Sequence, residues 1–369
     1  MYWSLFACLL GTVYATEYLL SDRFVGNTFF TGFTHEAIPD PTHGRVHYVD
    51  RATAIKHNLS WASNSKFTIR ADHTTVLSPS GSGRMSVRLK SNRQWATSVL
   101  VLDITHMPRG CGTWPAFWTL GDNWPYGGEI DVIEGVNSIG PNQASLHTSA
   151  GCTQPPSTWP RYSGTLTSTN CDTYTSSNVG CGIKSTSQNS FGPAFNSIGG
   201  GWYAMERTNR TISIWFWPRH SPNVPRDVKS GTSTTVRTQG WGTPMAAFVD
   251  DTCPISSLFS AHNIIINLTF CGDWAGSVYS SSGCPGSCVD YVDNNPEAFV
   301  DAYFEFNSLR IYTPKTSGKA AKIVNCIGGH LIGIRQTIVG WFVRARQNTR
   351  RRPRMQSVGV GAGSDVREL

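Results

Sequence analysis

The chain contains 369 residues, of which 39% are hydrophobic and 15% are charged, and its formal net charge at pH 7 is +7. A basic protein invites a nucleic-acid-binding interpretation. However, residues 315–369 hold eleven Lys and Arg against two Asp and Glu, a net charge of +9, so residues 1–314 carry −2. This distribution argues against nucleic-acid binding by the part of the chain before residue 315.

The N-terminal residues 1–15 resemble a signal peptide. The stretch from Tyr2 to Tyr14 is mostly apolar, and Val13-Tyr14-Ala15 is similar to a cleavage site. The stretch lacks Lys and Arg, and Tyr14 is bulky for such a site. An N-terminal anchor or a start codon placed too late is the alternative, but we expect cleavage and a secreted, extracellular or wall-associated protein.

Short apolar or alternating runs recur between turn residues after the leader, whereas no long segment before residue 314 has helical periodicity. We predict strands at Val99–Thr105, Thr211–Trp217, Asn263–Phe270 and Val300–Tyr312. Sandwiches of two to three hundred residues are commonly one domain. We therefore expect residues 16–314 to form a single all-β domain.

Eight of the ten cysteines form an even set that is typical of disulfides in a secreted protein: Cys111, Cys152, Cys171, Cys181, Cys253, Cys271, Cys284 and Cys288. Their pairing cannot be read from the sequence. Cys284 and Cys288 have a spacing that metal sites also use, but no partner histidines accompany them, so disulfides are favoured. Glycosylation sequons at Asn58, Asn209 and Asn267 also fit secretion, although Asn267 lies in an apolar run.

Three acidic residues, Glu129, Asp131 and Glu134, fall within six positions and are separated only by aliphatic residues. Carboxylates in a strand that tends to be buried are costly unless they take part in chemistry. Side chains alternate across a strand, so Glu129 and Asp131 share one face. One extra residue before Glu134, a β-bulge, would return its side chain to that face. A solvated acidic strand and a calcium site are the alternatives.

Paired carboxyl groups a few ångströms apart are the groups that catalyse glycoside hydrolysis. One attacks the anomeric carbon as a carboxylate, and the other protonates the leaving oxygen and then activates water. In retaining enzymes the two groups lie about 5–5.5 Å apart. We assign Glu129 as the nucleophile, Glu134 as the acid/base and Asp131 as the residue that tunes Glu129.

Three tryptophans, Trp114, Trp118 and Trp124, precede these acids. Flat aromatic rings stack on the apolar faces of sugars, although core packing is the alternative for each of them. Trp124, beside the glycines that lead into the acidic segment, is the first candidate for substrate contact and Trp118 the second. Asn137, which closes the acidic segment, is a further candidate.

At these residues the chain resembles the fungal endo-β-1,3(4)-glucanases of glycoside hydrolase family 16, in their laminarinase-like branch. The likeness covers about residues 17–313 and rests on segments in family order: Asp40–Gly44, Gly110–Pro115, Gly128–Asn137, Gln143–Thr148, Tyr203–Arg207 and Gly272–Gly276. The resemblance implies a β-jelly-roll sandwich, concanavalin A-like, with a concave substrate cleft. It also implies retaining endo-hydrolysis of β-1,3 or mixed-linkage β-1,3/1,4 glucans.

Carried over by motif, the resemblance gives Glu129, Asp131 and Glu134 the same roles, and it places Trp124, His147 and Trp274 along the sugar subsites. The family often carries a structural calcium away from the cleft. No acidic calcium loop is legible in this sequence, so no cofactor is required and calcium is left open. The expected partner is β-glucan, with no nucleic acid, no membrane for the catalytic domain and a monomeric state.

The C-terminal residues 315–369 depart from the family pattern. Residues 323–343 are moderately apolar but include Asn325, His330 and Arg335, which a membrane-spanning helix tolerates poorly. A disordered basic extension is therefore favoured over an anchor. An error of gene prediction is a third interpretation.

Other function classes share this scaffold. A cell-wall glucan transglycosylase uses the same nucleophile and acid/base, but such relatives usually have one residue fewer before the second glutamate. The presence of both Val132 and Ile133 favours hydrolysis. A non-catalytic β-glucan-binding protein or a structural wall protein would not need Glu129 and Glu134.

Overall fold

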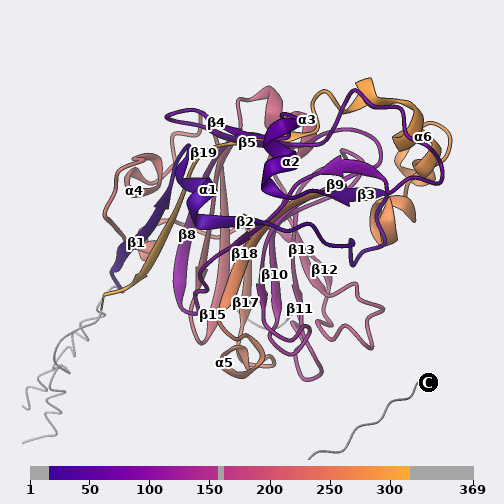
Figure 1. Cartoon of the computed structure of the whole chain (residues 1–369). Helices are drawn as coiled ribbons and strands as arrows, with labels where there is room; N and C mark the ends of the chain where they lie inside the picture. The colour runs from indigo at the N-terminus through magenta and orange to yellow at the C-terminus, as the bar shows by residue number, and fades with distance from the viewer. Residues whose placement is uncertain (1–15, 157–161, 316–369) are drawn as a thin grey trace, which may run out of the picture. The chain divides into compact units, whose positions relative to one another are not determined.

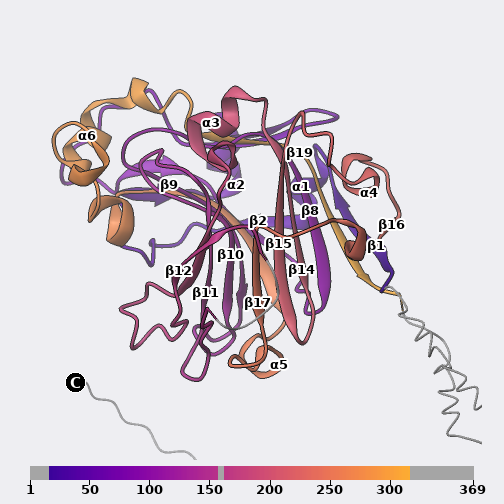
Figure 2. The same ribbon diagram turned by 180° about the vertical axis from the view of Figure 1, so that it is seen from behind.

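Two antiparallel β-sheets pack face to face in the computed structural model of the chain, which describes residues 16–156 and 162–315 (Figures 1 and 2). The first sheet runs in the order β16 (Thr235–Val236), β1 (Tyr18–Phe24), β19 (Tyr303–Pro314), β8 (Ser98–His106), β14 (Gly201–Arg207), β15 (Thr211–Pro218) and β17 (Ala246–Val249). Beside β19 it is extended by β5 (Phe67–Arg70) and β4 (Ser60–Ala62).

The second sheet carries the acidic segment near its middle. Its order is β12 (Thr165–Ser168), β13 (Cys181–Lys184), β11 (Gln143–His147), β10 (Glu129–Glu134), β9 (Thr113–Gly121), β18 (His262–Phe270), β7 (Arg88–Ser91) and β2 (Phe33–His35). A separate parallel pair consists of β3 (Val46–Tyr48) and β6 (Arg84–Ser86). The prediction of an all-β sandwich is thus confirmed.

The α-helices of the described residues are short, and the longest of them, α6 (Cys288–Asn294), has seven residues. The others are α1 (Thr28–Gly32), α2 (Arg51–Lys56), α3 (Gly192–Ser197), α4 (Arg226–Lys229) and α5 (Ile255–Leu258). None of these helices has the length and hydropathy that a membrane span requires.

All four predicted runs form strands, namely β8, β15, β18 and β19. The last strand begins at Tyr303 rather than at the predicted Val300. A 3-10 helix occupies Pro296–Phe299, and the N–H of Ala302 donates to the carbonyl of Phe299 at 3.0 Å. Val300 lies in this turn and is 52% exposed, so the expected alternation starts later.

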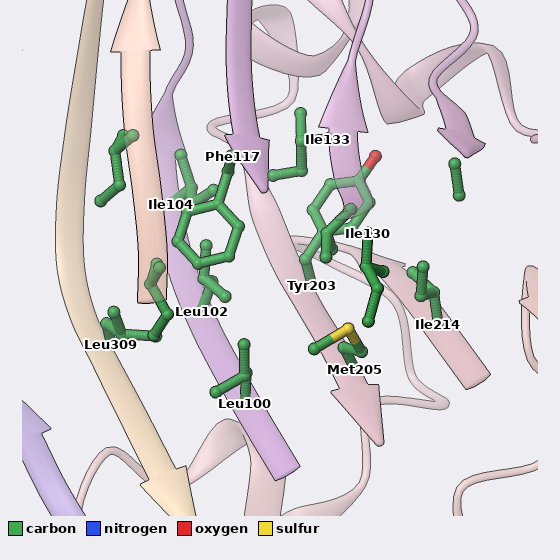
Figure 3. Close-up of a cluster of buried hydrophobic side chains, with 14 of the residues drawn as sticks. Leu100, Leu102, Ile104, Phe117, Ile130, Ile133, Tyr203, Met205, Ile214 and Leu309 are labelled. Carbon is green, nitrogen blue, oxygen red and sulfur yellow. The ribbon is translucent and has the colours of Figure 1, made fainter. Parts of the chain in front are cut away.

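Apolar side chains from both sheets fill the space between them (Figure 3). The first sheet contributes Leu100, Leu102 and Ile104 of β8. They face a layer from β9 and β10 that includes Phe117 and Ile130, and all five side chains are at most 1% exposed. Each such burial is worth about 1.5–3 kcal/mol, and it holds β10 against the core on one face.

Four disulfides confirm the prediction from the even set of cysteines: Cys111–Cys284, Cys152–Cys253, Cys171–Cys181 and Cys271–Cys288. Cys284 and Cys288 therefore bond to different partners. Two of the bridges fix the segment from residue 271 to 288 against the residues around the start of β9 and the end of β18.

The described ends of the chain lie side by side, because β1 pairs with β19 and the N–H of Lys315 donates to the carbonyl of Glu17 at 2.9 Å. The predicted leader, residues 1–15, and nearly all of the predicted extension, residues 316–369, lie outside the described residues. Cys8 and Cys326 lie there too. The domain boundaries at residues 16 and 314 stay predictions.

Candidate active site

The acidic strand β10 contains an irregularity between Asp131 and Glu134. Asp131 lies opposite Ser145 on β11, and Glu134 lies opposite Gln143, so three steps on β10 match two on β11. Val132 has no register partner on β11 or on β9. This extra residue is the β-bulge that the spacing of the acids predicts, and it re-aims the Glu134 side chain.

Two backbone groups at the bulge form hydrogen bonds with the side chain of Asn142. The side-chain N–H of Asn142 donates to the carbonyl of Val132 at 2.9 Å. Its Oδ1 accepts a hydrogen bond from the N–H of Glu134, also at 2.9 Å. Leaving either buried group without a partner would cost about 1–3 kcal/mol.

At the other end of β10, one carboxylate oxygen each of Glu129 and Asp131 and one ring nitrogen of His147 lie within 4.8 Å of one another. His147 on β11 stands directly opposite Glu129 in the strand register. Its Nε2 lies 3.3 Å from Oδ2 of Asp131, and its Nδ1 lies 3.2 Å from Oδ1 of Asn178. The ring is therefore held on both sides.

Trp114 on β9 donates its indole N–H to Oε1 of Glu134 at 2.9 Å. The Trp114 ring meets Trp274 edge to face, with ring centroids 5.7 Å apart. A cavity of about 280 Å³ opens beside Glu134, and its lining includes Trp274, Gln143 and Lys184. Trp274 belongs to the segment that two disulfides fix in place.

The buried carboxyl groups titrate far from their ordinary range. Burial raises the pKa of Asp131 well above its usual value, and the charges of Glu129 and Glu134 act in the same direction. Burial also raises the pKa of Glu134 to about 7, although the Trp114 hydrogen bond and the His147 charge lower it. Near neutral pH, Glu134 can therefore hold or release a proton.

For His147, burial alone would lower the pKa, but Asp131 and the charges of Glu129 and Glu134 outweigh it and raise the pKa to about 10. The imidazole is therefore a cation at neutral pH. It offsets part of the negative charge that three neighbouring carboxyl groups would otherwise concentrate in one place.

The aromatic residues predicted to contact substrate differ in exposure. Trp124, in the loop before β10, is 43% exposed. Trp118 is half-buried on β9 opposite Asp131, where its indole N–H donates to Oδ1 of Asn267 at 2.7 Å. Asn267 is itself buried, whereas the sequon residues Asn58 and Asn209 are exposed.

Asn137, predicted to bind substrate, is 3% exposed. Its Oδ1 accepts from the N–H of Gly112 at 2.8 Å, and its side-chain N–H groups donate to the carbonyl of Ala275 at 2.9 Å and to Oγ of Ser282 at 3.1 Å. Both polar atoms are thus used inside the protein, where they join the residues near Trp274 to those before β9.

Two residues that the sequence did not single out for the site, Trp114 and Asn142, contact Glu134 directly. Alternation places residues 114, 116 and 118 on one face of β9, but only the register, in which Ala116 pairs with Glu134 and Trp118 with Asp131, brings that face beside the acids. No comparable signal marks Asn142, which precedes β11 and acts through the bulge.

Among the described residues, Glu129, Asp131 and His147 form the one group of three side chains able to hold a metal ion. Calcium takes oxygen ligands, and this group includes an imidazole. We therefore assign no calcium ligands, and calcium stays open, as the sequence left it.

A family model described as the XgeA-like catalytic GH16 domain matches residues 33–312. The chain belongs to glycoside hydrolase family 16. Membership in this glycoside hydrolase family confirms the resemblance seen in the sequence. The chain is 46% identical over 301 residues to a probable glycosidase of Schizosaccharomyces pombe. This match covers 81% of the chain and 70% of the relative. The present chain spans less than half the length of the Aspergillus relatives named probable endo-1,3(4)-beta-glucanases.

Solved structures of the family share the fold. Laminarinase 16A from Phanerochaete chrysosporium, solved with two beta-glucans in its donor and acceptor sites, has a TM-score of 0.79 and 56% identity. An elongating family 16 beta-1,3-glucosyltransferase has a TM-score of 0.74 and 40% identity. Each match covers 80% of this chain and 100% of the other. These matches confirm the jelly-roll sandwich.

Proposed function

We propose that this protein is an endo-β-1,3(4)-glucanase that hydrolyses β-1,3 or mixed-linkage β-1,3/1,4 glucans with retention of anomeric configuration. The observation that carries the proposal is the bulged strand β10, which gathers three carboxyl groups and His147 while giving Glu134 a pKa of about 7. The names of the family relatives, and the beta-glucans bound to the Phanerochaete laminarinase, support this substrate class.

In the first step, a carboxylate oxygen of Glu129 attacks the anomeric carbon and forms a covalent bond to the sugar as the glycosidic bond breaks. Glu134 gives its proton to the departing glycosidic oxygen. The indole N–H of Trp114 occupies Oε1 of Glu134, so Oε2 is the oxygen that carries this proton.

In the second step, Glu134 acts in its ionised form. It takes a proton from a water molecule whose oxygen attacks the anomeric carbon, and the carboxylate of Glu129 leaves. Asp131 lies beside Glu129 and tunes it, and the charge of His147 limits the repulsion among the carboxylates. The enzyme returns to its starting protonation state.

The sugar contacts are assigned by exposure and position. Trp124 and Trp274 offer aromatic surface in the loop before β10 and in the cavity beside Glu134, and Trp118 offers a half-buried edge. We assign Asn137 a positioning role instead, because its amide holds two protein segments together.

Secretion is part of the proposal. Four disulfides are typical of oxidising compartments, and the sequon residues Asn58 and Asn209 are exposed where a glycan could attach. We propose that the catalytic domain acts as a monomer on β-glucan outside the cell, without membrane or nucleic-acid partners.

A glucan transglycosylase is the second candidate, because a beta-1,3-glucosyltransferase is among the structures similar to this chain. The two enzymes differ in whether an acceptor sugar or water attacks the sugar bound to Glu129. The two-residue spacing of Val132 and Ile133 favours water, in line with the sequence prediction. A non-catalytic glucan-binding protein would not need a proton donor held by Trp114.

The proposal is tested with the purified protein on laminarin, barley mixed-linkage glucan and cellulose, with the products separated by chromatography over time. We expect oligosaccharides of several lengths from laminarin or barley glucan and none from cellulose. Products longer than a supplied oligosaccharide would indicate the transglycosylase. Binding without turnover would contradict both enzymes.

A further inference from the structure

The β-bulge of β10 is supported by a side chain rather than by the strand ladder alone. Val132 lacks a register partner on both neighbouring strands, and its carbonyl accepts from the side-chain N–H of Asn142. The N–H of Glu134 donates to the same side chain. A single amide group thus closes both sides of the bulge that aims Glu134.

Asn142 is itself fixed by contacts from several elements. The backbone N–H of Asn142 donates to Oγ of Ser190 at 2.9 Å, and its backbone carbonyl accepts from the N–H of Ser185 at 2.8 Å. Oγ of Ser190 donates in turn to the carbonyl of Ser187, and the carbonyl of Ser190 accepts from the hydroxyl of Tyr203 on the opposite sheet. Asn142 and Ser190 are fully buried. These bonds fix the backbone of Asn142, and the N–H of Glu134 and the carbonyl of Val132 set the orientation of its side-chain amide.

We propose that Asn142 is a positioning residue for Glu134: it holds the bulge so that the Glu134 carboxyl group stays beside the indole N–H of Trp114. The inference rests on the proposed acid/base role of Glu134. A slip of one residue in a strand turns every side chain to the other face. Without the side-chain amide of Asn142, the strand can lose the β-bulge at Val132, and the Glu134 carboxyl group then moves away from the Trp114 indole.

Asparagine meets this need in a way that related side chains do not. Its amide presents one donor and one acceptor side by side. Aspartate keeps the acceptor for the N–H of Glu134, loses the donor for the carbonyl of Val132 and adds a buried charge near Glu134. Serine offers one hydroxyl in place of the two polar atoms of the amide, and alanine offers no polar side-chain atom.

The test compares Asn142→Ala, Asn142→Ser and Asn142→Asp with Asn196→Ala. The side chain of Asn196, in α3, makes the same pair of bonds to a backbone N–H and carbonyl, those of Met107, at 3.0 and 2.9 Å. Its side-chain N–H also contacts Nε2 of His106 at 3.0 Å, so Asn196→Ala controls for the loss of at least two such bonds. Each variant is assayed on laminarin and on an aryl β-glucoside whose dinitrophenolate leaves without a proton.

We expect the Asn142 variants to lose about 10²-fold in kcat/KM on laminarin, within the range that general acid catalysis supplies. On the aryl substrate the loss in kcat/KM should stay below about tenfold, because attack by Glu129 on this substrate needs no proton donor. The loss should be smallest in Asn142→Ser, which keeps an acceptor without adding a buried charge. Equal losses on both substrates, or the same losses in Asn196→Ala, would overturn the inference.

Glu134→Ala, run in parallel, separates this inference from the proposed function. If Glu134→Ala loses the same factor on both substrates, the acid/base role itself is wrong. If Glu134→Ala is selective and the Asn142 variants are not, only the positioning role is wrong. Failure of all three Asn142 variants to fold, while Asn196→Ala folds, would also contradict a role directed at Glu134.

Discussion

The indole N–H of Trp114 donates a hydrogen bond to Oε1 of Glu134 across 2.9 Å, between the neighbouring strands β9 and β10. The bond favours the ionised carboxylate and so opposes burial, which raises the pKa of Glu134 to about 7. The balance of these effects puts the titration of Glu134 where a residue that alternates between acid and base needs it.

Replacing Trp114 with Phe removes the N–H and keeps a ring. The pKa of Glu134 should then rise, by about one unit for the loss of one hydrogen bond to a charged group. Because the acid must be protonated to act, activity is lost as the pH rises through this pKa. The alkaline limb of kcat/KM on laminarin should therefore move to higher pH, as measured by a pH–rate profile. Trp61→Phe, at a 42% exposed tryptophan on β4, is the control. A limb that stays or moves down would contradict the bond's role.

Replacing His147 with Gln removes a cation that lowers the pKa of Glu134. The alkaline limb should again move to higher pH, and kcat should fall about 10–100-fold because the carboxylates lose their counter-charge. His57→Gln, at an exposed histidine that ends α2, should leave the profile unchanged. A shift of the limb to lower pH in the His147 variant would be inconsistent with a cationic His147.

Replacing Glu129 with Gln keeps the shape of the side chain but removes the carboxylate that we propose as the nucleophile. Turnover of laminarin should fall on the order of 10³-fold or more. Circular dichroism and the melting temperature should stay close to those of the parent protein. Substantial residual activity in a preparation free of parent enzyme would rule out Glu129 as the nucleophile.

The disulfide Cys111–Cys284 joins residues 173 positions apart and helps to fix the segment that carries Trp274. The double variant Cys111→Ser/Cys284→Ser should lose about 2–5 kcal/mol of unfolding free energy, since long closed loops restrict the unfolded chain most. The variant Cys171→Ser/Cys181→Ser opens a loop of only 10 positions and should lose less. Urea unfolding of both measures the difference, and the reverse order would contradict the loop argument.

The parts of the site that sequence alone could predict follow from local rules. The period of two along a strand, applied to Glu129, Asp131 and Glu134, predicts both the shared face and the bulge. The even set of cysteines predicts disulfides, and short runs between turn residues predict the sandwich strands.

The parts that the sequence could not predict depend on pairing between distant segments. Trp114 meets Glu134 only through the register of β9 on β10. The side chain of Asn137 is buried because a segment more than 130 residues later, near Ala275, accepts its hydrogen bond. Asn142 acts only once the bulge exists, so its role is visible in the fold and not in its own position.

Proton NMR of the first products released from laminarin is the most direct test of the proposed mechanism. Attack by Glu129 followed by attack of water inverts the anomeric carbon twice, so new reducing ends should form first as the β anomer and only later equilibrate. The α anomer as the initial product would mean a single displacement by water, and Glu129 could not then be the nucleophile.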